Sequence, residues 1–193
     1  MKLFSPLYKK VMIWSRHRLA VRYLFGLSFA ESSFFPVPPD IMLAPMSLAK
    51  PHKAMYYAFL TTIASVLGGA LGYLIGMGFY EWVKPFIEGQ GHWAEKYQIT
   101  RQWFEQWGIW AVFIAGFSPI PYKIFTITAG ILQMQFLPFI AASLIGRGAR
   151  FYLVAFLMKV GGSNMEQKLE KYIDFLGWLV ILLGIILYFI YKS

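Results

Sequence analysis

Apolar residues occur in long runs along this chain, and the clearest run, Ala54 to Tyr80, contains no charged residue. A helix of this length extends about 40 Å, which is enough to cross a hydrocarbon layer of ~30 Å with some tilt. Two later runs are also apolar over helical lengths. The pattern therefore predicts transmembrane helices at 54–80, 136–158 and 175–191.

Two further apolar segments are interrupted by proline: "FFPVPPDIMLAP" at 34–45 and "FSPIPYK" at 117–123. Proline lacks a backbone N–H and drives the preceding residue out of the helical region, so these clusters break a helix. Broken backbone at membrane depth is tolerated only where protein or water covers it. We therefore predict re-entrant hairpins at 23–49 and 108–135, broken by Pro36, Pro38, Pro39, Pro119 and Pro121.

Charges in the flanking segments predict an orientation. Residues 1–22 carry six basic and no acidic residues, and Lys50 and Lys53 follow the first hairpin. Cytoplasmic flanks are typically basic, so the N-terminus and both ends of this hairpin are expected in the cytoplasm. Residues 1–22 are also expected to form a basic amphipathic helix. The segment 81–107, with three basic and four acidic residues and four tryptophans, is predicted to be an extracytoplasmic interfacial helix.

One span separates the two hairpins, so they should enter the bilayer from opposite sides. Aligning the first proline cluster with the second places Asp40 opposite Lys123. Paired broken segments of this kind are typical of inverted-repeat transporters, whose binding sites lie near the midplane. The predicted fold is an all-α integral membrane protein, a single domain over 1–193 with an inverted-topology repeat of two opposed re-entrant hairpins plus transmembrane helices.

Composition agrees with a membrane location, because 58% of the 193 residues are hydrophobic and only 14% are charged. The absence of cysteine excludes disulfides and thiolate metal sites. The net charge of +9 is expected to face membrane lipids with anionic head groups rather than nucleic acid. The three histidines lie far apart, so neither a metal nor a cofactor is predicted, and the oligomeric state stays open.

Ionisable residues inside the apolar stretches are the candidate functional groups. Each unpaired charge at the membrane centre costs at least about 2.5 kcal/mol, so these groups need partners. One interpretation is structural, with Asp40 and Lys123 as an ion pair and the arginines as interfacial anchors. The other is functional, with the cations binding a phosphate or other anion and the acids exchanging protons. The acids are Glu31 and Asp40; the cations are Lys123, Arg147 and Arg150.

A glycine row at Gly68, Gly72 and Gly76 marks one face of the first long span. Such a row lets another helix approach closely, either a second copy of the chain or a hairpin of the same chain. We favour packing against a hairpin.

The segments "ESSFFPVPPD", "GGALGYLIGMGFYEW", "GFSPIPYK" and "GRGARF" resemble the DedA family, bacterial relatives of the VTT-domain lipid scramblases. The resemblance covers about residues 25–160 and is closest to the YqaA-like branch. It implies two opposed hairpins and movement of undecaprenyl phosphate or phospholipid across the bacterial inner membrane, dependent on the proton motive force. By position, Glu31 and Asp40 match the acids of the first hairpin. Lys123 stands at the later arginine of the second-hairpin motif, and Phe117 at the earlier one.

The favoured function is therefore a flippase or scramblase for a lipid phosphate, with protons as a coupled partner and no enzymatic activity. A proton- or ion-coupled carrier of a small anion and a noncatalytic assembly factor are the alternatives. A membrane-embedded lipid phosphatase needs a nucleophile beside a base, or a metal set, and the sequence offers neither.

Overall fold

A computed structural model describes residues 19–35, 37–87, 92–118 and 121–162, and this part of the chain is helical with short connections and no β-strand. The predicted helix at 175–191, and residues 1–18 of the predicted N-terminal helix, lie outside the described residues. We call Phe136–Gly162 the arginine helix. The elements are α2 (Ala20–Ser33), α3 (Asp40–Ala49), the 3-10 helix η1 (Pro51–Lys53), α4 (Ala54–Ile87), α5 (His92–Phe117), α6 (Tyr122–Ile131) and the arginine helix.

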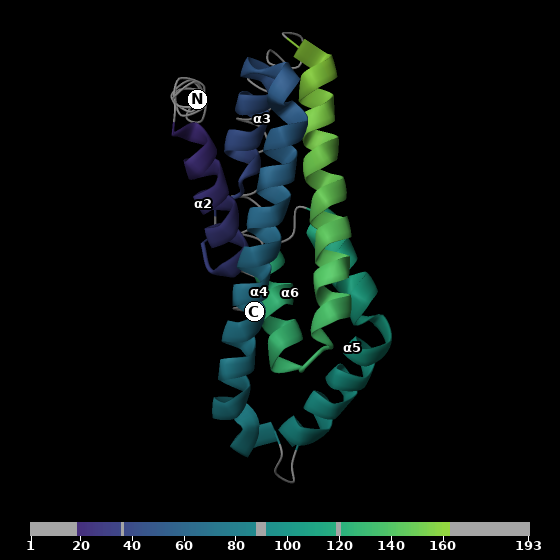
Figure 1. Ribbon diagram of the computed structural model, residues 1–193. Coiled ribbons are helices and arrows are strands. Elements are labelled where there is room, and N and C mark those ends of the chain that lie inside the picture. Colours follow the sequence, from purple (N-terminus) through teal and green to yellow (C-terminus); the bar gives the residue numbers. More distant parts are fainter. Residues whose placement is uncertain (1–18, 36, 88–91, 119–120, 163–193) are drawn as a thin grey trace, which may run out of the picture.

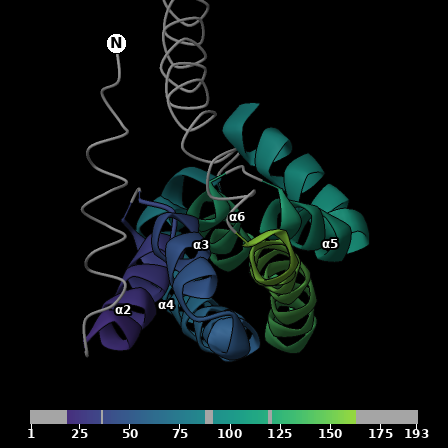
Figure 2. The same cartoon turned by 90° about the horizontal axis from the view of Figure 1, so that it is seen from above.

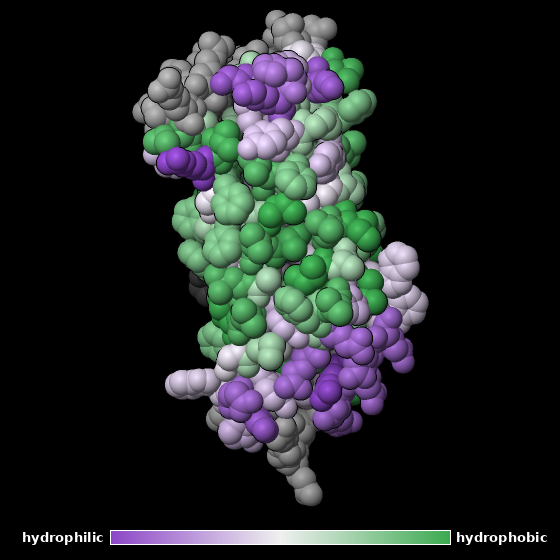
Figure 3. All heavy atoms as spheres, in the orientation of Figure 1, coloured by the Kyte–Doolittle hydropathy of each residue, from purple (hydrophilic) through white to green (hydrophobic). Residues whose placement is uncertain are grey.

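Two helical stretches, Pro51–Trp82 and Phe136–Gly162, are long and apolar enough to cross a membrane. Both run along most of the length of the molecule, whereas α2 and α3 occupy one half and α6 the other (Figure 1). Apolar side chains form a band around the middle of the visible face, and polar side chains gather at the two ends (Figure 3). This distribution suits a bundle whose middle lies in hydrocarbon.

The helices next to the proline clusters are too short to cross a bilayer. With 14 residues in α2 and 10 in each of α3 and α6, they extend about 21 and 15 Å. Pro39 directly precedes α3, and Pro121 directly precedes α6. The chain therefore leaves the helix where the sequence predicted a break. Pro38 also lies in the first break, while Pro36 and Pro119 fall outside the described residues.

The predicted interfacial helix at 81–107 needs correction, because the structure divides this segment between two helices. Residues 81–87 continue α4, and α5 begins at His92 and runs on to Phe117. The helix α4 continues through Glu81 and Lys84 and contains Pro85, and no proline interrupts α5 where its composition changes from polar to apolar near Gly108. Charge counting locates a polar segment but does not locate the ends of helices.

The glycine row of α4 contacts both proline-flanked helices. A Cβ atom added at Gly68 would lie 2.1 Å from the carbonyl oxygen of Phe29 in α2, and one at Gly76 would lie 2.1 Å from that of Ile127 in α6. Gly72, between them, faces Thr126 of α6 and the carbonyl of Ser32. The row is therefore filled by intramolecular packing on α2 and α6, as favoured from the sequence.

Buried side chains form two apolar clusters with a polar layer between them. The first cluster joins α2, α3, the start of α4 and the arginine helix around Leu24, Leu43 and Phe151. The second joins α4, α5, α6 and the other end of the arginine helix around Tyr73, Tyr122 and Phe139. Seen from above, α4 lies between α2 and the arginine helix, with α5 beyond (Figure 2).

Candidate functional site

The polar layer lies near the middle of both long helices and collects hydroxyl groups from α2, α4, α6 and the arginine helix. In α2, Ser28 donates a hydrogen bond to the carbonyl of Thr61 (2.8 Å), and Ser33 donates one to the carbonyl of Gly68 (2.9 Å). These bonds fix α2 against α4. In the part of the chain that the structure describes, the buried polar residues are Ser28, Glu31, Ser32, Ser33, Thr61, Thr62, Ser65, Thr126, Ser143 and Arg147, together with Ser47 of α3.

Arg147 and Glu31 form an ion pair at the centre of this layer. The Nη2 atom of Arg147 donates to the Oε2 atom of Glu31, and the Arg147 side chain is only 2% exposed. A charge this deeply buried is stable only when it is paired and hydrogen-bonded. The pair joins the arginine helix to the end of α2.

Two serines complete the hydrogen bonding of this pair. The Nε atom of Arg147 donates to the hydroxyl of Ser65 at 2.6 Å, and its Nη2 atom lies 3.3 Å from the hydroxyl of Ser32. The Ser32 hydroxyl donates to Glu31 Oε2 at 3.1 Å and shares a 2.7 Å hydrogen bond with Ser65. Three helices thus meet at one guanidinium.

Two aromatic rings lie close to the guanidinium of Arg147. Its guanidinium carbon lies 4.9 Å from the ring centroid of Tyr122 and 4.6 Å from that of Phe151, which are cation–π distances. Tyr122 is itself held by a hydrogen bond from its hydroxyl to Ser143, and Ser143 donates to the carbonyl of Phe139 at 2.6 Å. Arg147 is therefore fixed in position as well as neutralised.

Arg150 forms a second and more accessible pair one helical turn further along the same helix. Its Nη2 atom lies 2.6 Å from Oδ2 of Asp40, at the start of α3, and its Nη1 atom donates to the carbonyl of Ser118, just after α5. The side chains of Arg150 and Asp40 are 19% and 23% exposed. The second oxygen of Asp40, Oδ1, is buried and has no hydrogen-bond partner.

Lys123 is not the partner of Asp40, which corrects the ion pair expected from aligning the two proline clusters. Its Nζ atom lies 3.4 Å from the carbonyl oxygen of Phe34, at the end of α2. Lys123 is half-buried and forms no carboxylate pair among the described residues. It therefore adds a third cation where the two proline-flanked segments meet.

The structure brings all five predicted ionisable residues to the junction of α2, α3, α6 and the arginine helix. No motif in the sequence predicted Ser32, Ser65 or Ser143 as partners of these residues. Each of these serines lies inside an apolar run, where a hydroxyl without a partner is costly, and this position in the sequence is the signal that would have identified them. Phe117, at the position of the family's earlier arginine, is exposed.

The three cations at this junction outnumber the two carboxylates, and the excess positive charge is chemically suited to an anion. Arginine presents a planar fork that matches two phosphate oxygens, and lysine adds a point charge. Among the described residues, no group of three or more histidine, aspartate or glutamate side chains is arranged to hold a metal ion.

Comparison with known proteins finds that residues 35–160 match the VTT domain family. A protein of Haemophilus influenzae is 50% identical over 196 residues, which cover 100% of each chain. Undecaprenyl phosphate transporter A of Staphylococcus aureus is 32% identical over 137 residues, or 67% of this chain and 68% of the relative. The protein of the same name from Bacillus subtilis is 29% identical over 92 residues, 43% and 46% of the two chains. No solved structure matches.

Proposed function

Because the chain belongs to the VTT-domain (DedA) family of membrane proteins, we propose that it moves a lipid phosphate across the bacterial inner membrane. The ligand class is undecaprenyl phosphate or a phospholipid. The observation that carries this proposal is the pair of guanidinium–carboxylate contacts, Arg147–Glu31 and Arg150–Asp40, near the middle of the bundle. Buried charge at membrane depth is expensive and usually marks a transport path.

The proposed topology has two re-entrant hairpins that enter from opposite sides, as an inverted repeat. Its support is the shortness of α2, α3 and α6, and the contact between the two proline-flanked segments. The hydroxyl of Thr126 in α6 lies 3.4 Å from the carbonyl of Ser32, and Lys123 reaches the carbonyl of Phe34. In this proposal the basic N-terminus and residues 50–53 face the cytoplasm and anionic lipid head groups.

Lipid binding in this proposal is coupled to protonation of the acids. A phosphate that approaches Arg150 or Arg147 meets a carboxylate that already occupies the guanidinium. Two anions on one cation repel each other, so the phosphate binds best when Asp40 or Glu31 has taken up a proton. Release of the lipid then favours loss of the proton. This exchange gives a physical basis for transport driven by a proton gradient.

The test is translocation by purified protein in proteoliposomes, measured with labelled polyisoprenyl phosphate and labelled phospholipid, with and without a pH gradient. We expect transfer of a phosphate lipid that responds to the gradient and slows in Lys123→Ala. Competition by soluble anions alone would instead indicate a carrier of small anions. Failure to move any lipid or ion would indicate an assembly factor.

A further inference from the structure

The two arginines of the site differ in how firmly they are held. Arg147 is 2% exposed and contacts Glu31, Ser32 and Ser65, and two aromatic rings lie at cation–π distances from it. For Arg147 to accept a ligand, several of these contacts must break inside a closely packed interior. Each buried polar group left without a partner costs free energy, so this exchange is unfavourable.

Arg150 is held by one carboxylate oxygen and one backbone carbonyl, those of Asp40 and Ser118. Its pair is about one-fifth exposed. The pairing with Asp40 is also incomplete, because Oδ1 of Asp40 is buried and lacks a hydrogen-bond partner. A phosphate offers several oxygens to the arginine fork, and thus competes well against a carboxylate bound through one oxygen.

We propose that Arg150 is the ligand-contacting arginine, which exchanges Asp40 for the phosphate, and that Arg147 stays bound to Glu31 as a positioning residue. This inference rests on the proposed function and assigns unequal roles within its site. The ligand is a phosphate group whose unesterified oxygens fit the arginine fork, carried either by a lipid head group or as free phosphate. Asp40 acts as a built-in competitor that occupies the phosphate position when the site is empty.

The exchange also affects how the two proline-flanked segments are joined. Arg150 connects the start of α3, through Asp40, to the residue after α5, through Ser118. When phosphate replaces Asp40, this connection opens on the α3 side. The Arg147–Glu31 pair remains and keeps the arginine helix attached to α2. Ligand binding therefore loosens α3 while the rest of the bundle stays in place.

The test measures binding of undecaprenyl phosphate and of inorganic phosphate to purified full-length protein in nanodiscs. Asp40→Asn removes the competing charge, so we expect its Kd for undecaprenyl phosphate to fall roughly tenfold. Arg150→Gln should raise the Kd by a similar factor. The double variant Asp40→Asn/Arg150→Gln should bind as weakly as Arg150→Gln, because the gain requires the guanidinium.

Glu31→Gln should not lower the Kd for undecaprenyl phosphate. Arg101→Gln, which removes an exposed arginine paired with Glu105 on α5, serves as the matched control. Thermal unfolding identifies any variant that fails to fold, and Arg150→Lys, which keeps the charge but lacks the fork, then replaces Arg150→Gln. A tighter Glu31→Gln variant, or a gain in Asp40→Asn that persists without Arg150, overturns the inference while leaving the proposed function intact.

Binding of inorganic phosphate as tight as that of the lipid would assign the site to a free phosphate, with the same roles for Arg150 and Asp40. If wild-type protein binds neither probe, the inference and the proposed function both fail.

Discussion

Arg147 shows what a single buried charge requires in this bundle. A carboxylate, two hydroxyls and two aromatic rings surround one guanidinium. Removing one member of a buried pair leaves the other charge uncompensated, which is more damaging than replacing both with apolar groups. The pair is therefore needed for charge balance more than for net stability.

Arg147→Met should lower the free energy of unfolding by roughly 3 kcal/mol, because Glu31 is left buried without its cation. Glu31→Met/Arg147→Met should recover most of this loss, since Ser32 and Ser65 still hydrogen-bond to each other at 2.7 Å. Unfolding in mixed micelles, followed by tryptophan fluorescence, measures the free energy of unfolding of the single and the double variant. If the double variant is as unstable as the sum of the single variants, the charge-balance interpretation is wrong.

Gln133 provides a second prediction at a single residue, in the turn between α6 and the arginine helix. It has a positive φ of 55°, which only glycine adopts without strain. Gln133→Gly should raise the free energy of unfolding by about 1 kcal/mol and Gln133→Val should lower it. Gln135→Gly, in the same turn without a positive φ, is the control and should give no gain. Melting temperatures decide the comparison.

At the scale of elements, α2 and α6 both pack against α4. The carbonyl groups of α2 and α6 approach Gly68 and Gly76 so closely that a methyl group does not fit. The arginine helix repeats this arrangement, because a Cβ at Gly146 would lie 2.6 Å from the carbonyl of Phe113 in α5. Close backbone contacts therefore fix the short helices that carry the polar layer.

Gly76→Ala should destabilise the protein by about 1–3 kcal/mol, because the new methyl group forces α4 away from α6. Gly78→Ala, on the same helix with nothing within 4 Å of the added Cβ, is the matched control. It should be neutral or slightly stabilising, since alanine favours the helix. Equal melting temperatures for the two variants would show that the glycine row does not set the helix spacing.

The sequence predicted the helix breaks because proline acts locally, and it predicted the apolar spans because hydropathy is a sum over neighbouring residues. The prediction that Lys123 pairs with Asp40 was wrong for a physical reason. Aligning the two proline clusters identifies positions that correspond in sequence, and such correspondence does not by itself bring two side chains into contact. Arg147 and Arg150, three residues apart on one helix face, were the better guide to two neighbouring pairs.

The boundaries of α4 and α5 could not be read from charge, because a helix continues through a change from apolar to polar composition. The hydroxyl partners of Arg147 depend on how three helices are packed, which the sequence pattern does not specify. The glycine row was easier to interpret, because glycines allow another helix to approach closely whatever residues that helix carries.

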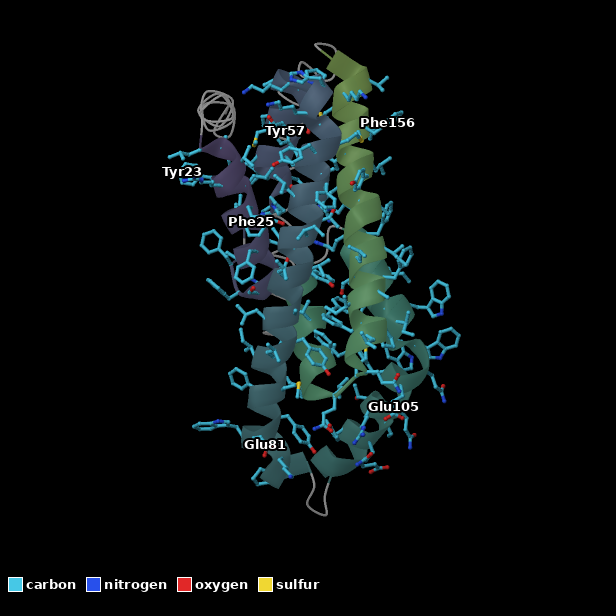
Figure 4. All side chains as sticks on the ribbon, in the orientation of Figure 1. Tyr23, Phe25, Tyr57, Glu81, Glu105 and Phe156 are labelled. Atoms are coloured by element: carbon cyan, nitrogen blue, oxygen red, sulfur yellow. The ribbon has the colours of Figure 1, made fainter. Side chains whose placement is uncertain are left out.

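At the scale of the molecule, the apolar band and its polar ends define how the bundle lies in a membrane. Glu81 and Glu105 lie towards one end, whereas Tyr57 and Phe156 lie towards the other (Figure 4). The polar layer of Arg147 and Arg150 falls between the two apolar clusters. A phosphate that crosses the membrane would thus meet its compensating charges half-way.

Orientation can be tested directly, because the chain contains no cysteine. His52 of η1 and Glu95 of α5 are both exposed. The connection between α3 and α4 and the start of α5 lie at opposite ends of the bundle (Figure 1). In intact spheroplasts, a membrane-impermeant maleimide should label Glu95→Cys, and should label His52→Cys only after permeabilisation. The reverse pattern would place the N-terminal side of the bundle outside the cell.

The central claim is that this bundle carries a lipid phosphate past its buried ion pairs. The most direct measurement is the initial rate of polyisoprenyl phosphate transfer between leaflets in proteoliposomes. We predict transfer well above the protein-free rate for wild-type protein and Arg101→Gln, and slower transfer for Asp40→Asn, which binds the lipid more tightly and releases it more slowly. A wild-type rate equal to that of protein-free vesicles, or an unchanged rate in Asp40→Asn, would contradict it.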